Sequence, residues 1–253
     1  MIQRVVFVVL ALGLAAHVQG QPSGDVTMLC STALRRVMND LGPRFEQVSQ
    51  QRLVVQYGTS TSLAQRIEKG ERFDLAVLTP ELIDRLVTRG AIAGQTRTSI
   101  ARAPMALAIR AGSRKPDVTT TGALTATLLA APSVAYAKDG AAGLYFASLI
   151  EGLGIAQAVR QKSVLTETGG QVSEAVATGR ADMGVLPLSE IVGVTGIDVL
   201  GTFPLDVQGY AVMVAGIGTA AVNGRAAQQL VDFLTSPDAG QVIEQAGMER
   251  PAR

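Results

Sequence analysis

Apolar positions along the chain alternate between two kinds of spacing. Short apolar runs predict β-strands, and apolar residues that recur every three or four positions predict amphipathic helices. The predicted strands are residues 26–29, 53–57, 74–78, 105–109, 133–137, 183–186, 199–203 and 210–214, and the predicted helices are 34–48, 63–70, 81–88, 121–129, 144–152, 172–178 and one that begins at Ser236. This alternation predicts an α/β fold with mostly parallel sheets, in one large domain or two small ones.

The first residues have the order of a secretory signal. Arg4 supplies a positive charge, residues 5–16 are apolar, and small or neutral residues follow up to a cut before Gln21. A membrane anchor is the alternative, but this apolar run is too short for a bilayer core, which needs about 20 residues. We therefore expect residues 1–20 to be a signal peptide that is removed on export to the periplasm. No later segment is long and apolar enough to span, so we expect no stable membrane insertion.

Cleavage changes the charge and the available chemistry. The chain has 22 basic and 21 acidic residues, and loss of Arg4 leaves 21 of each, so no net field attracts nucleic acid. The only histidine, His17, leaves with the signal, which excludes histidine bases and histidine-bound metals. We expect no metal and no other cofactor. Cys30 is the only cysteine, so no intrachain disulfide can form, and we favour a buried thiol at a strand end over a lipid anchor.

Hydroxyl groups and glycines gather where predicted strands turn into helices. In open α/β sheets ligands bind at these turns, beyond the carboxyl ends of the strands. The turns are residues 30–33, 58–62, 79–80, 138–143 and 168–171. Helix N-termini present free N–H groups and a partial positive charge, which suit an oxyanion without any cationic side chain. The alternative is that these hydroxyls only cap their helices, which is favoured for any single turn but not for several that converge.

Charged candidates are fewer. Lys138 could pair with an anion, and Asp139 and Glu190 could act as acids or bases, although we favour structural roles for both carboxylates because surface carboxylates are common. The turn at 140–143 does not match a phosphate-binding P-loop, which ends in Gly-Lys-Ser/Thr.

Four segments carry a resemblance to a known family. They are residues 61–70 (Thr-Ser-Leu-Ala-Gln-Arg-Ile-Glu-Lys-Gly), 74–75, 142–145 and 236–239. With these segments the chain resembles the periplasmic solute-binding components of ABC transporters, most closely the molybdate-binding-protein-like branch. The resemblance implies a type II periplasmic-binding-protein fold, with one lobe over residues 25–102 plus 207–253, a second over 103–206, and solute held in the cleft between them.

The family's oxyanion site uses serine hydroxyls, backbone N–H groups and a tyrosine. Ser60 matches one serine, and Ala142 and Val172 match residues that offer backbone N–H groups. Ala33 stands at the other serine position, with Ser31 and Thr32 beside it, and Pro187 stands at the tyrosine position. The resemblance thus implies a ligand site made by five residues: Ser31, Thr32, Ser60, Ala142 and Val172.

Two side-chain donors of the family pattern are missing, and each charged hydrogen bond that a buried anion lacks costs about 1.5–3 kcal/mol. Molybdate is therefore disfavoured. Residues 186–190 (Leu-Pro-Leu-Ser-Glu) also resemble a side branch of the family that includes aconitate isomerase, which implies an organic polycarboxylate ligand.

Three functions follow from these observations. The leading hypothesis is a monomeric periplasmic protein that binds a small anion, an oxyanion or a small carboxylate, for a membrane ABC permease. The second is an isomerase that shifts a double bond in a polycarboxylate, with a base among Lys138, Asp139, Glu167, Glu190 and the tyrosines. The third is a sensory or scaffold domain that keeps the fold without the ligand.

Overall fold

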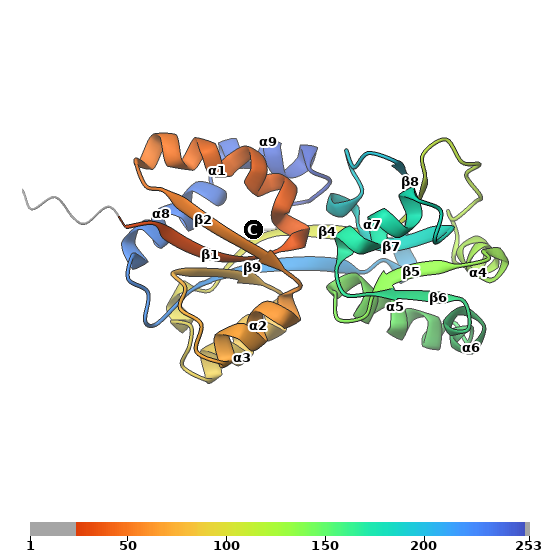
Figure 1. The fold of residues 1–253 in the computed structure, drawn as a ribbon, viewed down its shortest axis with the longest axis horizontal. Coiled ribbons are helices and arrows are strands. Elements are labelled where there is room, and N and C mark those ends of the chain that lie inside the picture. Colours follow the sequence, from red (N-terminus) through yellow and green to blue (C-terminus); the bar gives the residue numbers. More distant parts are fainter. Residues whose placement is uncertain (1–23, 251–253) are drawn as a thin grey trace, which may run out of the picture.

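The structure is a computed structural model that describes residues 24–250. Its elements form two halves along the long axis of the molecule, and strands β4 (Thr98–Arg110) and β9 (Tyr210–Ile217) run from one half into the other (Figure 1). We call the half that contains the first strand the first lobe, and the other the second lobe. The predicted signal peptide, residues 1–20, lies outside the described residues.

The first lobe alternates strands and helices up to β4 and is completed by the C-terminal helices. Helix α1 continues directly from a 3-10 turn, η1 (Thr32–Leu34), at the end of the first strand. The other elements of this lobe are β1 (Val26–Ser31), α1 (Arg35–Ser49), β2 (Leu53–Gly58), α2 (Ser60–Glu68), β3 (Leu75–Leu78), α3 (Pro80–Thr88), η2 (Gly94–Thr96), α8 (Gly224–Leu234) and α9 (Pro237–Gln245).

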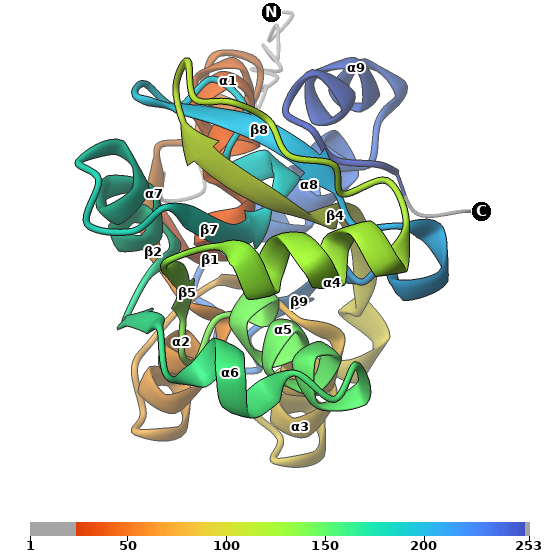
Figure 2. The same ribbon diagram turned by 90° about the vertical axis from the view of Figure 1, so that its right-hand side faces the viewer.

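The second lobe lies between β4 and β9 in sequence. Helices α4 and α6 cover its outer end, away from the first lobe (Figures 1 and 2). Its elements are α4 (Thr121–Ala130), β5 (Val134–Ala137), α5 (Ala141–Gly152), α6 (Ala156–Arg160), β6 (Ser163–Thr166), α7 (Gly169–Ala177), β7 (Met183–Pro187), η3 (Leu188–Glu190), β8 (Ile197–Thr202) and η4 (Leu205–Val207).

The strands form one hydrogen-bonded series in the order β2-β1-β3-β9-β4-β7-β5-β6, with β8 also paired to β4. β1 pairs in parallel with β2 and β3, and β5 pairs in parallel with β6 and β7, as expected for strands joined by helices. Every pair that involves β4 or β9 is antiparallel, and β4 and β9 themselves cross between the lobes in opposite directions.

β4 changes partners where the lobes meet. Thr98–Pro104 pairs with β9, and Met105–Ile109 pairs with β7. Pro104 has no N–H to donate, so it suits the point at which one ladder ends. This change lies close to residue 103, where the family resemblance places the start of the second lobe. The lobe limits of 25–102 plus 207–253 and 103–206 remain a prediction.

Apolar side chains fill both faces of the sheet. On one face of the first lobe, α1, α8 and α9 pack against β1, β3, β4 and β9, and on the other face α2 and α3 enclose a second cluster (Figure 1). In the second lobe α7 packs on β5 and β7. The first cluster continues into the second lobe through Met105 and Phe203, so the lobes share buried apolar contacts at the crossing strands.

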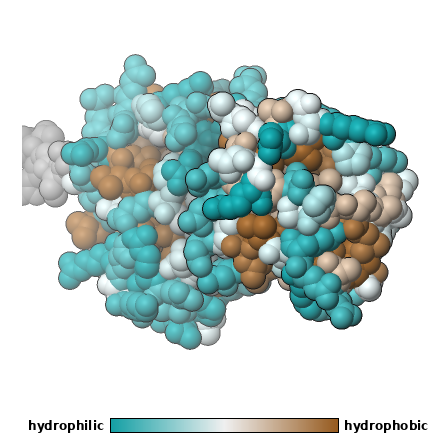
Figure 3. Space-filling view, turned by 45° about the vertical axis from the view of Figure 1, so that its right-hand side comes forward, coloured by the Kyte–Doolittle hydropathy of each residue, from teal (hydrophilic) through white to brown (hydrophobic). Residues whose placement is uncertain are grey.

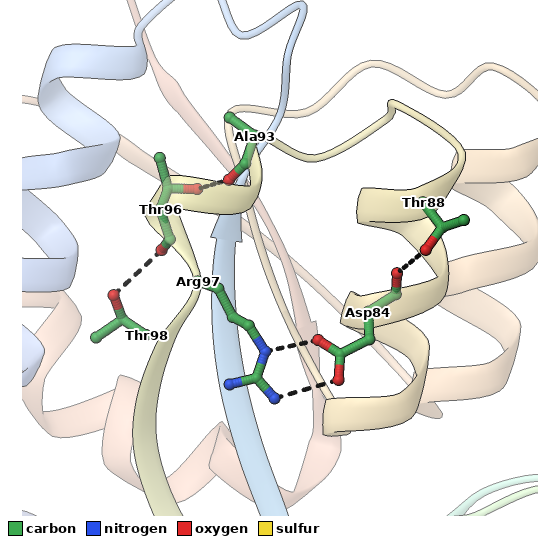
Figure 4. Close-up of polar contacts among 6 residues, drawn as sticks. All are labelled: Asp84, Thr88, Ala93, Thr96, Arg97 and Thr98. Atoms are coloured by element: carbon green, nitrogen blue, oxygen red, sulfur yellow. Dashed lines mark hydrogen bonds and ion pairs between the residues drawn. The ribbon is translucent and has the colours of Figure 1, made fainter.

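Polar contacts fix the start of β4 to helix α3. The Arg97 guanidinium donates to the Asp84 carboxylate, with Nε 2.6 Å from Oδ1 and Nη2 3.3 Å from Oδ2 (Figure 4). Thr96 Oγ1 donates to the Ala93 carbonyl at 2.6 Å in the preceding turn. The end of the crossing strand is therefore held by the first lobe before the chain passes to the second.

The outer surface is mostly hydrophilic, with separate hydrophobic areas on the side turned toward the viewer in Figure 3. Leu144, on α5, is one of the exposed large apolar residues, at 55% exposure. Within residues 24–250 no helix is long and apolar enough to cross a membrane.

β6 was not predicted from the sequence, and several predicted elements are shorter than those in the structure. β6 lies at the edge of the sheet, and Leu165 in it is 58% exposed, so the strand has no buried apolar run to reveal it. Cys30 is fully buried in β1, as predicted, and burial raises the pKa of its thiol.

Candidate functional site

A small cavity lies between the lobes, at the carboxyl ends of β1, β2, β5 and β7. Its volume is about 30 Å³, enough for a compact charged group, because one water needs about 10–15 Å³. Both lobes contribute to its wall. The lining residues are Ser31, Thr32, Ala33, Thr59, Ser60, Ala137, Gly140, Ala141, Ala142, Gly143, Gly169, Val185, Leu186, Pro187 and Glu190. We call this space the small cavity.

Helix N-termini from both lobes converge on the small cavity. Ser60 is the first residue of α2, Ala142 the second residue of α5, and Gly169 the first residue of α7. N–H groups in the first turn of a helix have no carbonyl partner within that helix, and they carry its partial positive charge. Among the described residues no lysine or arginine lines the small cavity, so the donors that the lining residues offer to an anion there are neutral.

Ser60 carries the most informative side chain of the site. The residue is 5% exposed, and its hydroxyl has no hydrogen-bond partner among the described residues. The helix does not need this group as a cap, because the hydroxyl of Thr59 already accepts from the Ser62 N–H at 3.2 Å. A buried polar atom without a partner costs about 1–3 kcal/mol, so the Ser60 hydroxyl is a buried group whose hydrogen-bonding capacity is left unused at the wall of the small cavity.

Two glycines allow the close approaches that shape the small cavity. A Cβ added at Gly143 would overlap the Ala137 carbonyl oxygen, so only glycine lets the N-terminus of α5 sit against the end of β5. A Cβ at Gly169 would overlap Oε2 of Glu190, so only glycine lets that carboxyl group lie beside the N-terminus of α7.

Glu190 brings an acid into this donor-rich space. Its side chain is partly buried, and Thr32 Oγ1, from the other lobe, donates to Oε1 at 3.1 Å. Burial raises the pKa of Glu190 to about 7, while the Thr32 hydrogen bond and the Arg35 charge oppose the rise. Glu190 can therefore give or take a proton near neutral pH.

Further contacts between the lobes hold the segment that carries Glu190. The Ser189 hydroxyl donates to the Ala33 carbonyl at 2.7 Å, and Arg36 Nη1 donates to the Val192 carbonyl at 2.7 Å. On the far side of the small cavity, the Thr61 hydroxyl donates to the Asp139 carbonyl at 3.0 Å. These bonds bring both walls of the site together.

Wider grooves adjoin the small cavity, and two of them differ in their charged residues. The first has a volume of about 660 Å³, contains Arg35 and Arg36, and shares Thr32 and Glu190 with the small cavity. We call it the arginine groove. The second, of about 380 Å³, is lined by Glu81 and Asp139 but by no lysine or arginine. We call it the acidic groove.

Four of the five predicted ligand residues line the small cavity: Ser31, Thr32, Ser60 and Ala142. Val172 does not. It is fully buried within the second lobe, and its N–H donates to the Thr168 carbonyl at 3.2 Å as an ordinary helical bond. The N–H groups that α7 turns toward the cavity come from its first turn, at Gly169.

The other acid–base candidates lie outside the small cavity. Lys138 pairs with Glu167 at 2.8 Å on the surface, and Asp139 lies in the acidic groove. Of the candidates for a base that the sequence offered, which are Lys138, Asp139, Glu167, Glu190 and the tyrosines, only Glu190 lines the small cavity. Within residues 24–250 no group of three His, Cys, Asp or Glu side chains could hold a metal ion.

Comparison with known sequences identifies the family. The sequence model of the bacterial extracellular solute-binding protein family matches residues 26–249. The chain belongs to this family. The resemblance proposed from the sequence is thereby confirmed.

Curated relatives divide between an enzyme and binding proteins. An aconitate isomerase of a Pseudomonas species is 28% identical over 90% of this chain and 89% of its own length. The molybdate-binding protein ModA of Azotobacter vinelandii is 26% identical over 94% of this chain and 95% of its own. Relatives of similar sequence identity to this chain therefore include both an enzyme and a binding protein.

Solved structures share the fold at lower identity. The periplasmic molybdate-binding protein of Azotobacter vinelandii superposes with a TM-score of 0.78 at 19% identity, over 90% of this chain and all of that one. The sulfate-binding protein SubI of Mycobacterium tuberculosis gives 0.74 at 16% identity, over 89% and 86% of the two chains. These matches confirm the α/β periplasmic-binding-protein fold.

Proposed function

We propose that this protein binds a small anion in the small cavity, as the solute-binding component of an ABC transporter. The observation that carries the proposal is the Ser60 hydroxyl, which is buried, has no hydrogen-bond partner within residues 24–250 and lines a cavity on which three helix N-termini converge. First-turn N–H groups and hydroxyls from both lobes would share the negative charge.

Delivery to a permease in the periplasm is part of the same proposal. It is supported by membership of the extracellular solute-binding family. A ligand that takes donors from both lobes would stabilise the closed arrangement, in which the lobes are in contact. A permease could then distinguish the ligand-bound protein from the free protein by this closed arrangement.

Isothermal titration calorimetry with molybdate, tungstate, sulfate, citrate, cis-aconitate and trans-aconitate tests the proposal. We expect saturable binding of at least one of these anions, and loss of roughly tenfold or more in affinity in Ser60→Ala, because one hydrogen bond to a charged group disappears. The Ser163→Ala variant is the control, since the Ser163 hydroxyl lies outside the small cavity and donates to the Val159 carbonyl within the second lobe. Absence of heat with every anion would reject the proposal.

Glu190 favours a second candidate function, isomerisation of a polycarboxylate. Moving a double bond by one position requires a base that removes a proton from the methylene carbon and an acid that returns one to the far end of the allylic system. A carboxyl group with a pKa of about 7 can do both in turn, so that substrate and product have the same composition. The 28% identity to an aconitate isomerase supports this candidate.

Incubation of the purified protein with cis-aconitate, followed by chromatography for the trans isomer, tests this second candidate. We expect turnover in the wild type and a loss of at least about 100-fold in Glu190→Gln, the lower end of what a general acid or base contributes. Glu244→Gln, at an exposed position of α9, is the control. Unchanged substrate in the wild type would reject the isomerase and leave the binding proposal intact.

A further inference from the structure

We propose that the ligand is an organic acid with two anionic ends, one in the small cavity and the other on Arg35 in the arginine groove. This inference rests on the proposed function, because it assumes that the small cavity takes the first anionic group. It adds a second binding site for an anionic group, which would make the protein bind polycarboxylates more tightly than compact oxyanions.

The volumes and the shared walls favour a ligand that extends beyond the small cavity. A cavity of about 30 Å³ takes a carboxylate group or a compact oxyanion, whereas the arginine groove offers about 660 Å³. Thr32 and Glu190 line both spaces, so a ligand held in the small cavity would continue past these two residues into the groove.

Arg35 is held in position without an ion pair among the described residues, although its charge acts on the nearby Glu190 carboxyl group. Its guanidinium lies over the Tyr57 ring, 4.0 Å from the ring centre. Among residues 24–250 it forms no ion pair and no side-chain hydrogen bond, whereas the neighbouring Arg36 donates to the Val192 carbonyl. Stacking on an aromatic face fixes the plane of a guanidinium and leaves its edge N–H groups free for a carboxylate.

Helix stability does not explain Arg35. It is the first residue of α1, and the 3-10 turn η1 precedes it, so it lies within about one turn of the start of the joined helical segment, where the partial positive charge still disfavours a cation. The first turn of α1 contains no acidic residue that would compensate for it. A cation kept at this position, beside an anion-binding cavity, is better explained by a ligand that brings the opposite charge.

The charges of the two grooves decide which one receives the second anionic group. The acidic groove also touches the small cavity, through Ser60 and Ala141, but its charged side chains are Glu81 and Asp139. These carboxylates would repel an anionic group. The arginine groove also contains Glu174 and Glu190, but it is the one that supplies cations.

Calorimetry on the full chain with the signal removed tests the second site. The probes are trans-aconitate, citrate and succinate, with acetate and molybdate as anions that fit the small cavity alone. We expect the best of the three polycarboxylates to bind at least tenfold more tightly than acetate and molybdate. Arg35→Gln should remove this advantage, with a loss of roughly tenfold or more, because a charge-assisted hydrogen bond is lost. Arg35→Lys should retain part of it, since a lysine keeps the charge but not the planar fork.

Arg44→Gln is the matched control, because Arg44 is an exposed residue further along α1 and lines none of the three spaces. The inference fails if a compact anion binds as tightly as the polycarboxylates, or if Arg35→Gln leaves polycarboxylate affinity within twofold of wild type. Either result would reject the second site and leave intact the proposal that the small cavity binds an anion. Absence of binding by every probe would instead reject the proposed function itself.

Discussion

At the scale of single residues, Glu190 stands apart from the groups around it. The small cavity is built from N–H and O–H donors, and Glu190 is the one ionisable side chain among its lining residues. In its protonated form it adds another donor, and in its ionised form it repels an anion. Its protonation state therefore sets both the charge and the donor count of the site.

The pH dependence of stability is the consequence of the raised Glu190 pKa. The folded protein holds this proton up to a pKa of about 7, while the ordinary pKa is 4.5, so the folded state binds more protons between these values. Stability contributed by Glu190 is then present below pH 4.5 and is lost as the pH rises to about 7.

Urea unfolding at pH 5 and pH 8 measures this contribution. We expect Glu190→Gln to gain stability relative to wild type on going from pH 5 to pH 8, by on the order of 2 kcal/mol, because glutamine cannot ionise. Glu244→Gln should show no such change. A difference between wild type and Glu190→Gln that is equal at both pH values would contradict the raised pKa.

The sequence predicted some residues of the site and missed others for a physical reason. Ser60 and Ala142 lie in turns between a strand and a helix, where hydroxyls and glycines gather along the sequence, and the family resemblance assigned both to the ligand site. The sequence offered Glu190 as one of several candidate acids or bases but did not place it in the ligand site, because it arrives there only where η3 docks on η1 across the cleft; the Ser189–Ala33 hydrogen bond between these turns joins residues 156 positions apart. Arg35 was not predicted as a site residue, because its position depends on stacking against the Tyr57 ring of β2, which a local sequence pattern does not reveal.

At the scale of elements, helix α5 depends on one close approach. Its N-terminus meets the carboxyl end of β5 at Gly143, where the Ala137 carbonyl leaves no room for a Cβ. The sequence predicted a helix only from residue 144, because the glycine-rich start of α5 has weak apolar periodicity. The structure extends the helix to Ala141, and so places three N–H groups at the cavity.

Glycine-to-alanine changes at the two ends of α5 test this contact. We expect Gly143→Ala to lower the free energy of unfolding by about 1–3 kcal/mol, because backbone must move to admit the methyl group. Gly152→Ala, at the other end of the helix, should raise it by about 0.5 kcal/mol, since nothing lies within 4 Å of an added Cβ. Thermal or urea unfolding measures both. Equal effects of the two changes would show that the contact does not constrain α5.

At the scale of the whole molecule, strand–helix alternation established the α/β class but not the two lobes. Patterns within short windows cannot reveal that β4 pairs with β9 at one end and with β7 at the other. The two-lobed arrangement came from the family resemblance, and the fold matches confirm it. The arginine groove lies between lobes, so no local pattern indicated it.

The position of β9 also has a consequence for the order in which the protein can fold. β9 (Tyr210–Ile217) lies between β3 (Leu75–Leu78) and β4 (Thr98–Arg110) in the sheet, yet it begins about 100 residues after the end of β4 and about 130 after the end of β3. A chain that emerges from its N-terminus first presents the strands of the second lobe before it presents the strand that fills the middle of the first. The sheet of the first lobe therefore stays incomplete between β3 and β4 until β9 has been made, and its helical layer stays incomplete until α8 and α9 follow. Until nearly the whole sequence has emerged, the unpaired edges of β3 and β4 can therefore bind a chaperone or pair with the wrong strand.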